Sequence, residues 1–175
     1  YALSKKGLQS TLYCQEESLA QGASGNAQGG FYPQLNAQAG NASQIHALCF
    51  TYASKLYKQL LNQGFDFTHQ WCGTLQLAFN PQVTQRYLKL TEQKTWPQDL
   101  IHWLDEKQAS DTANVSLPYP GLFVPKGGWI NLPELVASLT KAASAEVVTN
   151  KKLISLNREN NLWRLNWQDG SQTMA

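Results

Sequence analysis

The chain has 175 residues, of which 42% are hydrophobic and 15% are charged, and its formal net charge is +2. This length suits one domain or two small lobes with a buried core. The balanced charge gives no compositional case for a nucleic-acid or acidic partner. No apolar run approaches the ~20 residues that a membrane-spanning helix needs, and the start lacks the order of a secretory signal. The cysteines Cys14, Cys49 and Cys72 have no paired spacing, which is typical of free thiols, so we expect a cytoplasmic protein.

The N-terminal segment is predicted to be the end of a helix followed by a strand. Residues 1–6 precede Gly7, and glycine is favoured at a helix end because it adopts positive φ at little cost. Residues 10–14 then predict a short buried strand, which the acids Glu16 and Glu17 follow. In a dinucleotide-binding unit, an acid after the second strand binds the ribose, but the glycine-rich turn of such a unit is absent from these residues. On this pattern alone, an ordinary helix–strand junction is the simpler interpretation.

Residues 22–36, GASGNAQGGFYPQLN, contain four glycines and no charged side chain. Glycine lets a backbone approach a planar ligand closely, and successive N–H groups can bind an anion. Ser24, Asn26 and Gln28 add polar side chains at alternate positions. A flexible linker is the alternative interpretation, but the aromatic residues 31–33 favour a packed segment. We therefore predict that the backbone of this loop lies against a large flat cofactor.

Residues 42–61 carry the clearest helical pattern. Ser43 can cap this helix, and apolar side chains recur at helical spacing on one face. From Phe65 to Phe79 the period falls to two, which predicts strand, with a bulge or a close backbone approach at Gly73. The predicted apolar face of the helix consists of Ile45, Leu48, Cys49, Tyr52, Leu56 and Leu60.

The middle of the chain is predicted to be more irregular. Asn80, followed by Pro81, opens a polar helix that runs to about Lys94, and residues 105–113 form another short helix. The apolar residues 122–124 stand between prolines and glycines, which predicts a short strand bounded by turns.

The last third predicts one helix and a set of antiparallel strands. Asn131 can cap a helix in which Glu134 bonds back to the cap. Residues 147–156 and 162–167 then read as strands that turn at residues 159–161, and an Asp-Gly pair after the second strand signals a further turn. Because helices and strands alternate at both ends of the chain, we predict a mixed α/β fold.

Other residues gave weaker signals. His69 and Cys72 are three positions apart on an apparent strand and face opposite sides, so we expect no metal site. His102 lies on a stretch that reads as helical. Trp163 and Trp167 share one face of a predicted strand, and we interpret them as core residues rather than as a base-stacking surface.

Four blocks of sequence resemble one family. They are GLQSTLYCQEE, GASGNAQGGFYP, WCGTLQLAF and LFVPKGGWINLPEL, and they follow the order of the family over essentially the whole chain. The chain resembles the FAD-dependent oxidoreductase half of the bifunctional tRNA 5-methylaminomethyl-2-thiouridine biosynthesis proteins, which is similar to glycine oxidases and D-amino-acid oxidases. The resemblance covers an internal part of that half. It implies a D-amino-acid-oxidase-like fold, with a Rossmann-like FAD lobe in residues 1–63 and 126–175 and a partial substrate lobe in residues 64–125.

The resemblance implies oxidation of a carboxymethylaminomethyl group on the wobble uridine of tRNA. A hydride would pass to FAD from the carbon between the nitrogen and the carboxylate, and hydrolysis of the imine would release glyoxylate. S-adenosylmethionine would serve only a methyltransferase half, which has no counterpart in these residues. Without a glycine-rich pyrophosphate turn, we expect the 175 residues alone to be inactive. Two alternatives stay open: an FAD-dependent oxidase of a free small amino acid, and a non-catalytic tRNA-docking fragment.

The resemblance also implies site residues, although no catalytic residue is assigned. Glu16 is the candidate for the ribose contact, because Cys14 occupies the position where dinucleotide folds usually have the acid. Leu153 would place main-chain atoms against the adenine, and Lys126 and Trp129 would lie near the substrate entrance. The flavin and its ribityl chain would be lined by Ser24, Gly25, Asn26, Gln28 and Gly29.

Overall fold

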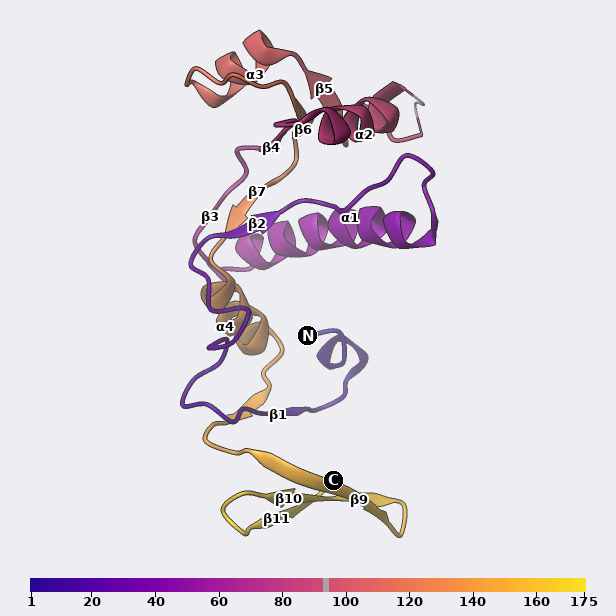
Figure 1. Cartoon of the computed structure of the whole chain (residues 1–175). Coiled ribbons are helices and arrows are strands. Elements are labelled where there is room, and N and C mark those ends of the chain that lie inside the picture. The colour runs from indigo at the N-terminus through magenta and orange to yellow at the C-terminus, as the bar shows by residue number, and fades with distance from the viewer. Residues whose placement is uncertain (93–94) are drawn as a thin grey trace. The chain divides into compact units, whose positions relative to one another are not determined.

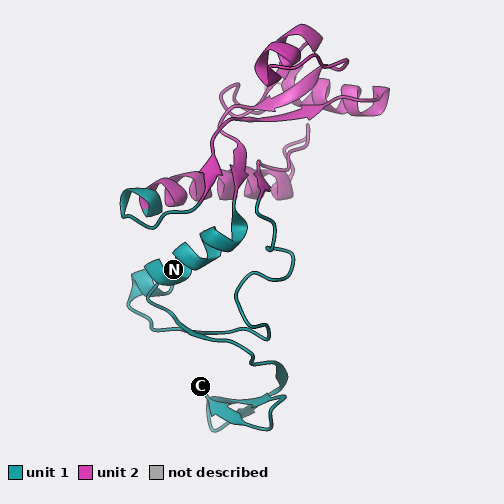
Figure 2. Ribbon diagram, turned by 90° about the vertical axis from the view of Figure 1, so that its left-hand side faces the viewer, with its two compact units in different colours: residues 1–27, 60–67, 131–175 teal, residues 28–59, 68–130 magenta. Residues whose placement is uncertain are grey.

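The computed structural model describes residues 1–92 and 95–175 (Figure 1). These residues divide into two compact units. Unit 1 consists of residues 1–27, 60–67 and 131–175, and unit 2 consists of residues 28–59 and 68–130 (Figure 2). Both units contain helices and strands, so the predicted mixed α/β fold is confirmed.

Unit 1 begins with a 3₁₀ helix and a pair of parallel strands. Helix η1 (Ser4–Lys6) ends at Gly7, whose φ of 76° lies in the left-handed region, so the predicted glycine-terminated helix end is confirmed. Strand β1 (Thr11–Tyr13) pairs in parallel with β8 (Glu146–Val148). The strand was predicted, but the prediction that it is buried is wrong, because Leu12 is exposed. A two-stranded sheet covers too little of its own surface to bury such a side chain.

Helix α4 (Leu132–Ala142) is anchored at its start and in its middle. Asn131 Oδ1 accepts the Glu134 N–H at 3.2 Å, and Asn131 Nδ2 donates to the Glu134 carboxylate at 2.9 Å, so the predicted cap is confirmed. The buried Ser138 donates its hydroxyl to the carbonyl of Asp66. This bond ties a second stretch of unit 1 to the helix.

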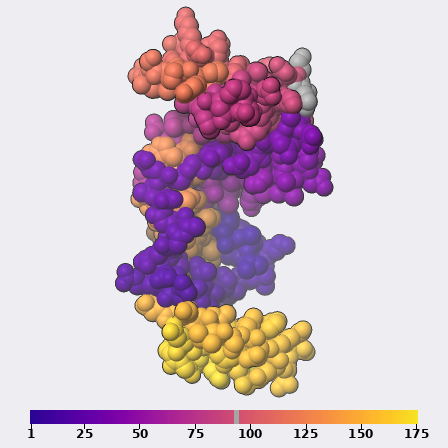
Figure 3. Space-filling model, in the orientation of Figure 1, coloured from indigo at the N-terminus to yellow at the C-terminus, as the bar shows by residue number. Residues whose placement is uncertain are grey.

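The C-terminal part of unit 1 is an antiparallel meander. Strands β9 (Leu153–Glu159), β10 (Leu162–Trp167) and β11 (Gln172–Met174) pair with β10 in the centre, and Figure 3 shows them in yellow as one group of atoms. Asn160 and Asn161, with φ of 48° and 67°, form the tight turn between β9 and β10. The predicted hairpin is confirmed, and β11 follows the second predicted turn. The single strand predicted over residues 147–156 is wrong, because this stretch is divided between β8 and β9.

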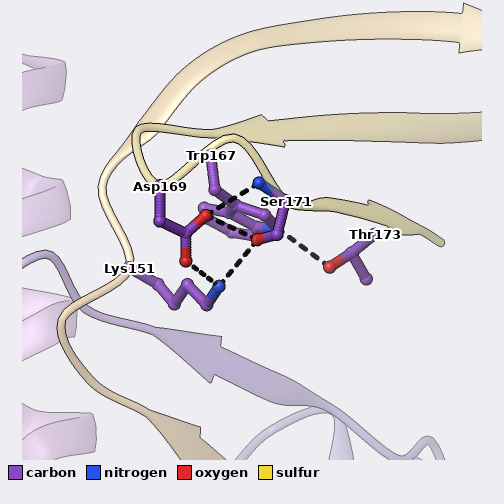
Figure 4. A network of polar contacts seen from close by, with 5 residues as sticks. All are labelled: Lys151, Trp167, Asp169, Ser171 and Thr173. Atoms are coloured by element: carbon purple, nitrogen blue, oxygen red, sulfur yellow. Dashed lines mark hydrogen bonds and ion pairs between the residues drawn. The ribbon is translucent and has the colours of Figure 1, made fainter.

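Polar contacts around Lys151 fix the turn between β10 and β11 (Figure 4). The ammonium of Lys151 contacts the Asp169 carboxylate and donates to Ser171 Oγ at 2.7 Å. Asp169 also accepts the Ser171 N–H at 2.9 Å and its hydroxyl at 2.6 Å. The hydrogen bond from Lys151, followed by those from Ser171, holds the pKa of the Asp169 carboxyl well below its usual range.

The two tryptophans of β10 have different environments. Trp167 is buried, stacks at 4.5 Å between ring centroids on Tyr13, and donates its indole N–H to Thr173 at 2.9 Å. Trp163 is exposed and pairs across the strands with Arg158. The prediction of a core residue is therefore confirmed for Trp167 and wrong for Trp163, because Tyr13 covers only one end of the meander.

Unit 2 contains most of helix α1 (Asn41–Asn62) and an antiparallel sheet. This sheet has the order β2 (Gly29–Phe31), β7 (Gly128–Ile130) and β3 (His69–Gln70). The Phe31 ring packs against Phe50 of α1, with 4.6 Å between the ring centroids. The helix predicted over residues 42–61 is confirmed.

The buried face of α1 agrees with the predicted one at Leu60 and differs from it at other positions. Leu48 is 70% exposed, and Ile45 and Tyr52 are also exposed. Phe50 is buried instead, because it packs against Phe31 of β2. This contact turns a different side of the helix toward the core. Ser43 does not cap the helix: it is buried, and its Oγ accepts a backbone N–H from the preceding loop at 2.9 Å.

A second antiparallel sheet in unit 2 has β6 (Gly121–Val124) between β4 (Thr74–Leu77) and β5 (His102–Leu104). The predicted strand over residues 122–124 is confirmed, whereas the helical assignment of His102 is wrong. Pairing of β5 with β6 decides its conformation, since tertiary context overrides a local pattern. Gly73, just before β4, has φ of 81°, and a Cβ there would lie 2.4 Å from the Phe123 ring, so the predicted close approach is confirmed.

Two capped helices cover this sheet. Helix α2 (Pro81–Glu92) begins after Asn80, whose Oδ1 accepts a backbone N–H at 2.9 Å. The prediction that it runs to about Lys94 falls outside the described residues. Helix α3 (Glu106–Ala113) begins after Asp105, which forms a capping box with Gln108. The core of the unit consists of Phe50, Ala78, Tyr87, Leu90, Ile101, Leu122 and Val124.

Candidate functional site

The glycine-rich loop is exposed from residue 21 to residue 28. The Gly25 N–H donates to the Gly22 carbonyl at 2.9 Å and closes a tight turn. A Cβ added at Gly25 would lie 3.1 Å from that carbonyl oxygen, whereas a Cβ added at Gly22 would meet no atom within 4 Å. The inner side of the turn is therefore tightly packed, and its outer side is open.

Two features of the first half of the loop, which belongs to unit 1, fit a flat cofactor. The backbone N–H groups of Ser24 and Asn26 donate to no protein acceptor within residues 1–92 and 95–175. The Asn26 carbonyl accepts the Leu132 N–H at 3.3 Å, which anchors the loop to the start of α4. Exposed N–H groups on an anchored, glycine-rich backbone can face an electron-rich ring without obstruction by side chains. Ser24 and Asn26 thus offer backbone N–H groups that fit a planar, electron-rich ligand.

The second half of the loop enters β2 in unit 2. Gln28 is exposed immediately before this strand. Gly29 and Gly30 pair with β7, and Gly30 lies opposite Trp129. The indole N–H of Trp129 donates to Gln70 Oε1 at 3.3 Å. The structure therefore brings the loop glycines and Trp129 together on neighbouring strands.

Lys126 lies in the turn between β6 and β7, close in sequence to Trp129. Its ammonium forms an exposed ion pair with Asp99. The hydrogen bond and the charge of Lys126 lower the pKa of the Asp99 carboxyl. Trp129 and Lys126 thus have different polar partners, and the structure does not bring their polar groups into one contact.

Backbone hydrogen bonds continue from β1 and β8 into the segment around Glu16. The Cys14 N–H donates to Val148 at 2.9 Å, and the Cys14 carbonyl accepts the Lys151 N–H at 2.8 Å. The Glu16 carbonyl accepts the Asn150 N–H at 2.9 Å. These bonds fix the backbone from which the Glu16 side chain extends.

Glu16 borders a cavity of about 450 Å³ within unit 1. Its carboxylate is exposed and accepts the amide of Gln15 at 2.8 Å. Leu153 is exposed on β9 and directly follows Lys152, which lines the same cavity. Sequence reasoning missed Lys152, although its position immediately before Leu153 was a usable signal. The cavity is lined by Gln15, Glu16, Asn150, Lys152, Gln168 and Asp169.

Residues 1–92 and 95–175 contain no candidate metal cluster and no candidate membrane span. No three His, Cys, Asp or Glu side chains in these ranges are grouped as metal ligands. None of the helices described there has both the length and the apolar character needed to cross a bilayer.

The chain matches one family model over its full length. Residues 1–175 match the family described as FAD dependent oxidoreductase. The chain belongs to this family. The predicted class of enzyme is therefore confirmed, and FAD is the cofactor of the FAD-dependent oxidoreductase family.

Curated relatives of this FAD-dependent oxidoreductase chain carry one common name. The chain is 44% identical, over 99% of its length, to the tRNA 5-methylaminomethyl-2-thiouridine biosynthesis bifunctional protein MnmC of Pseudoalteromonas atlantica. It is 39% identical, over 98% of its length, to the protein of that name from Pseudoalteromonas translucida. The matched part is 26% of each relative, so the chain spans about a quarter of their length.

Solved structures of FAD-dependent oxidoreductases share the fold. Glycine oxidase from Bacillus cereus matches 97% of this chain and 47% of its own, with a TM-score of 0.75 at 18% identity. Iminodiacetate oxidase from Chelativorans sp. BNC1 matches 100% of this chain and 49% of its own, with a TM-score of 0.72 at 16% identity. The predicted D-amino-acid-oxidase-like fold is confirmed.

Proposed function

We propose that the chain is part of an FAD-dependent oxidoreductase that acts on the wobble uridine of tRNA. It would remove the carboxymethyl group of 5-carboxymethylaminomethyl-(2-thio)uridine and leave 5-aminomethyl-(2-thio)uridine. One observation carries the proposal: the 44% identity, over 99% of this chain, to a protein named as a tRNA 5-methylaminomethyl-2-thiouridine biosynthesis bifunctional protein. The other activity of such a bifunctional protein would methylate the product. Because the substrate is tRNA, we place the protein in the cytoplasm.

The glycine-rich loop would hold the cofactor. Ser24 and Asn26 would present backbone N–H groups and Gln28 an amide, with Gly25 and Gly29 leaving room for the ring. Bound FAD would supply the hydride acceptor for the C–H bond between the amine and the carboxylate. Fixed N–H dipoles aimed at the ring would favour the negative charge that accumulates there. The exposure of residues 21–28 supports this role.

The cavity beside Glu16 would hold the adenosine end of the cofactor. Its volume of about 450 Å³ lies in the range of small-molecule sites. The Glu16 carboxylate would accept hydrogen bonds from the ribose hydroxyls, and Leu153 would offer main-chain atoms to the adenine. Lys152 is a further candidate, because it lines the same cavity.

The division into lobes is also a proposal. Residues 1–63 and 126–175 would belong to the FAD-binding lobe, and residues 64–125 to the substrate lobe. Lys126 and Trp129 would lie near the substrate entrance. The compact units of the structure are a division by packing and do not by themselves assign a ligand to either part.

The test uses the product of the complete coding sequence that includes these residues. It is incubated with tRNA that carries the 5-carboxymethylaminomethyl group and, separately, with free glycine and sarcosine. We expect glyoxylate from the modified tRNA and none from glycine. Glyoxylate from free glycine alone would contradict the proposal and favour an amino-acid oxidase. Release from neither substrate, by a protein that binds tRNA without flavin, would favour a docking module.

A further inference from the structure

Two adjoining cavities in unit 2 are bordered by lysines. The larger, of about 380 Å³, is lined by Lys55 and Lys58 of α1 and by Lys126. The smaller, of about 210 Å³, is lined by Lys58, Lys126 and Trp71. Because they share lining residues, the two cavities form one depression, which we term the lysine groove. Its charged residues and its tryptophan are Lys55, Lys58, Trp71, Asp99 and Lys126.

The lysine groove concentrates positive charge. Three lysines and one aspartate line it, an excess of two cations, whereas the entire chain has a net charge of only +2. Asp99 pairs with Lys126. Lys55 and Lys58 form no ion pair within residues 1–92 and 95–175. Their ammonium groups are therefore available to an external anion.

The presence of Trp71 favours a polynucleotide over a simple anion as the ligand of the groove. Trp71 is half-buried and is held by His69 at 4.7 Å and Phe31 at 5.6 Å between ring centroids. Trp71 lines the smaller cavity together with Lys58 and Lys126. Ammonium groups next to an aromatic face are the usual combination for single-stranded nucleic acid, because lysines contact phosphates and the ring stacks on a base. A free phosphate has no base that could stack on the indole ring.

We propose that the lysine groove is a contact site for the RNA backbone. The choice of RNA rests on the proposed function, in which tRNA is the substrate. Lys55 and Lys58 would each contact a phosphate, and Trp71 would stack on an unpaired base nearby. Contacts of this kind position an RNA without reading its sequence. The charge balance of the whole chain does not reveal the site, because acids elsewhere offset these lysines.

The first test compares two double variants that remove the same charge. Lys55→Gln/Lys58→Gln changes the groove, and Lys89→Gln/Lys107→Gln changes two exposed lysines of α2 and α3 in the same unit. Binding of fluorescently labelled tRNA is measured by anisotropy at several salt concentrations, after circular dichroism has shown that both variants fold. We expect the groove variant to bind about tenfold more weakly and its log–log salt slope to fall by roughly 1.5, since each lost phosphate contact removes about 0.7 to 0.9. Equal losses in both variants, or no loss in the groove variant, would overturn the proposal.

The second test separates stacking from charge. Trp71→Leu should weaken tRNA binding and leave the salt slope unchanged, because stacking releases no counterions. Inorganic phosphate and polyglutamate serve as competitors. Displacement of tRNA by millimolar phosphate would assign the groove to a small anion, and equally effective displacement by polyglutamate would assign it to an acidic protein. Either result would overturn the RNA assignment.

Failure of this proposal can be told from failure of the proposed oxidation. Glyoxylate release from modified tRNA and binding of labelled tRNA are measured separately on the same variants. Binding that depends on Lys55 and Lys58 without glyoxylate release supports the groove and rejects the oxidation. Glyoxylate release whose KM is the same in the parent and in the Lys55→Gln/Lys58→Gln variant supports the oxidation and rejects the groove.

Discussion

The hydroxyl of Ser138 on α4 donates to the carbonyl of Asp66 at 2.5 Å, and this bond joins positions that are 72 residues apart. Ser138 is buried, so its hydroxyl has exchanged water for this single partner. The contact fastens residues 60–67 to the helix within unit 1.

Removal of this hydroxyl should destabilise the chain. Ser138→Ala leaves the Asp66 carbonyl without its donor, and we expect a loss of about 1 kcal/mol in the free energy of unfolding. Urea denaturation followed by circular dichroism measures this loss. The exposed Ser116→Ala is the control and should leave the midpoint unchanged. Equal midpoints for both variants would show that the bond contributes nothing.

Substitutions at Gly73 and Gly64 separate the cost of side-chain crowding from the cost of a left-handed backbone. Both have positive φ, 81° and 79°, but a Cβ at Gly73 would lie 2.4 Å from the Phe123 ring, whereas one at Gly64 would meet nothing within 4 Å. Gly64→Ala should cost about 1 kcal/mol for the left-handed backbone alone. Gly73→Ala should cost a further 1–3 kcal/mol or so for overpacking. Urea midpoints of the two variants give the difference, and equal midpoints would refute the crowding at Gly73.

The Asp169 network predicts a dependence of stability on pH. Lys151 and Ser171 lower the folded-state pKa of Asp169, so its contribution is fully present above the unfolded pKa of about 3.9 and is lost as pH falls through the folded value. The parent should therefore lose more stability between pH 6 and pH 3 than Asp169→Asn does. Ser171→Ala, which removes one contact with the carboxylate and one with the Lys151 ammonium, should give an intermediate loss. Thermal midpoints at the two pH values measure these losses, and identical pH dependence in all three proteins would contradict the role of the network.

The open outer side of Gly22 gives a test of the loop. Because a Cβ there meets no atom, Gly22→Leu should leave the thermal midpoint of the protein unchanged. If the loop faces the isoalloxazine ring, the added side chain would obstruct it and weaken FAD binding by at least ~10-fold, or about 1.4 kcal/mol. Flavin fluorescence titration of the complete protein measures this. Undiminished FAD affinity would place the ring elsewhere.

Local signals in the sequence predicted the ends of elements well. The glycine after η1, the cap at Asn131 and the turn at Asn160 are confirmed because each depends on a few adjacent residues. Most of the buried face of α1 and the strand at His102 were predicted wrongly, since contacts with Phe31 and with β6 decide them. These partners are distant in the sequence, so no local pattern contains the information.

The roles of the candidate site residues stay predictions. The resemblance located the loop and Glu16, and the structure places both in exposed positions with open space beside them. Lys152 and the lysine groove were missed. Each depends on pairing of segments far apart in the chain, such as the ladder between residues 14–16 and 148–151 or the approach of Lys126 to α1.

The contacts of Lys151 fasten both ends of the β9–β10 hairpin at one point, because Lys151 precedes β9 and Asp169 follows β10. A protease that nicked the exposed Asn160–Asn161 turn would therefore release no peptide under native conditions. The two pieces would migrate together on a sizing column and separate only in denaturant.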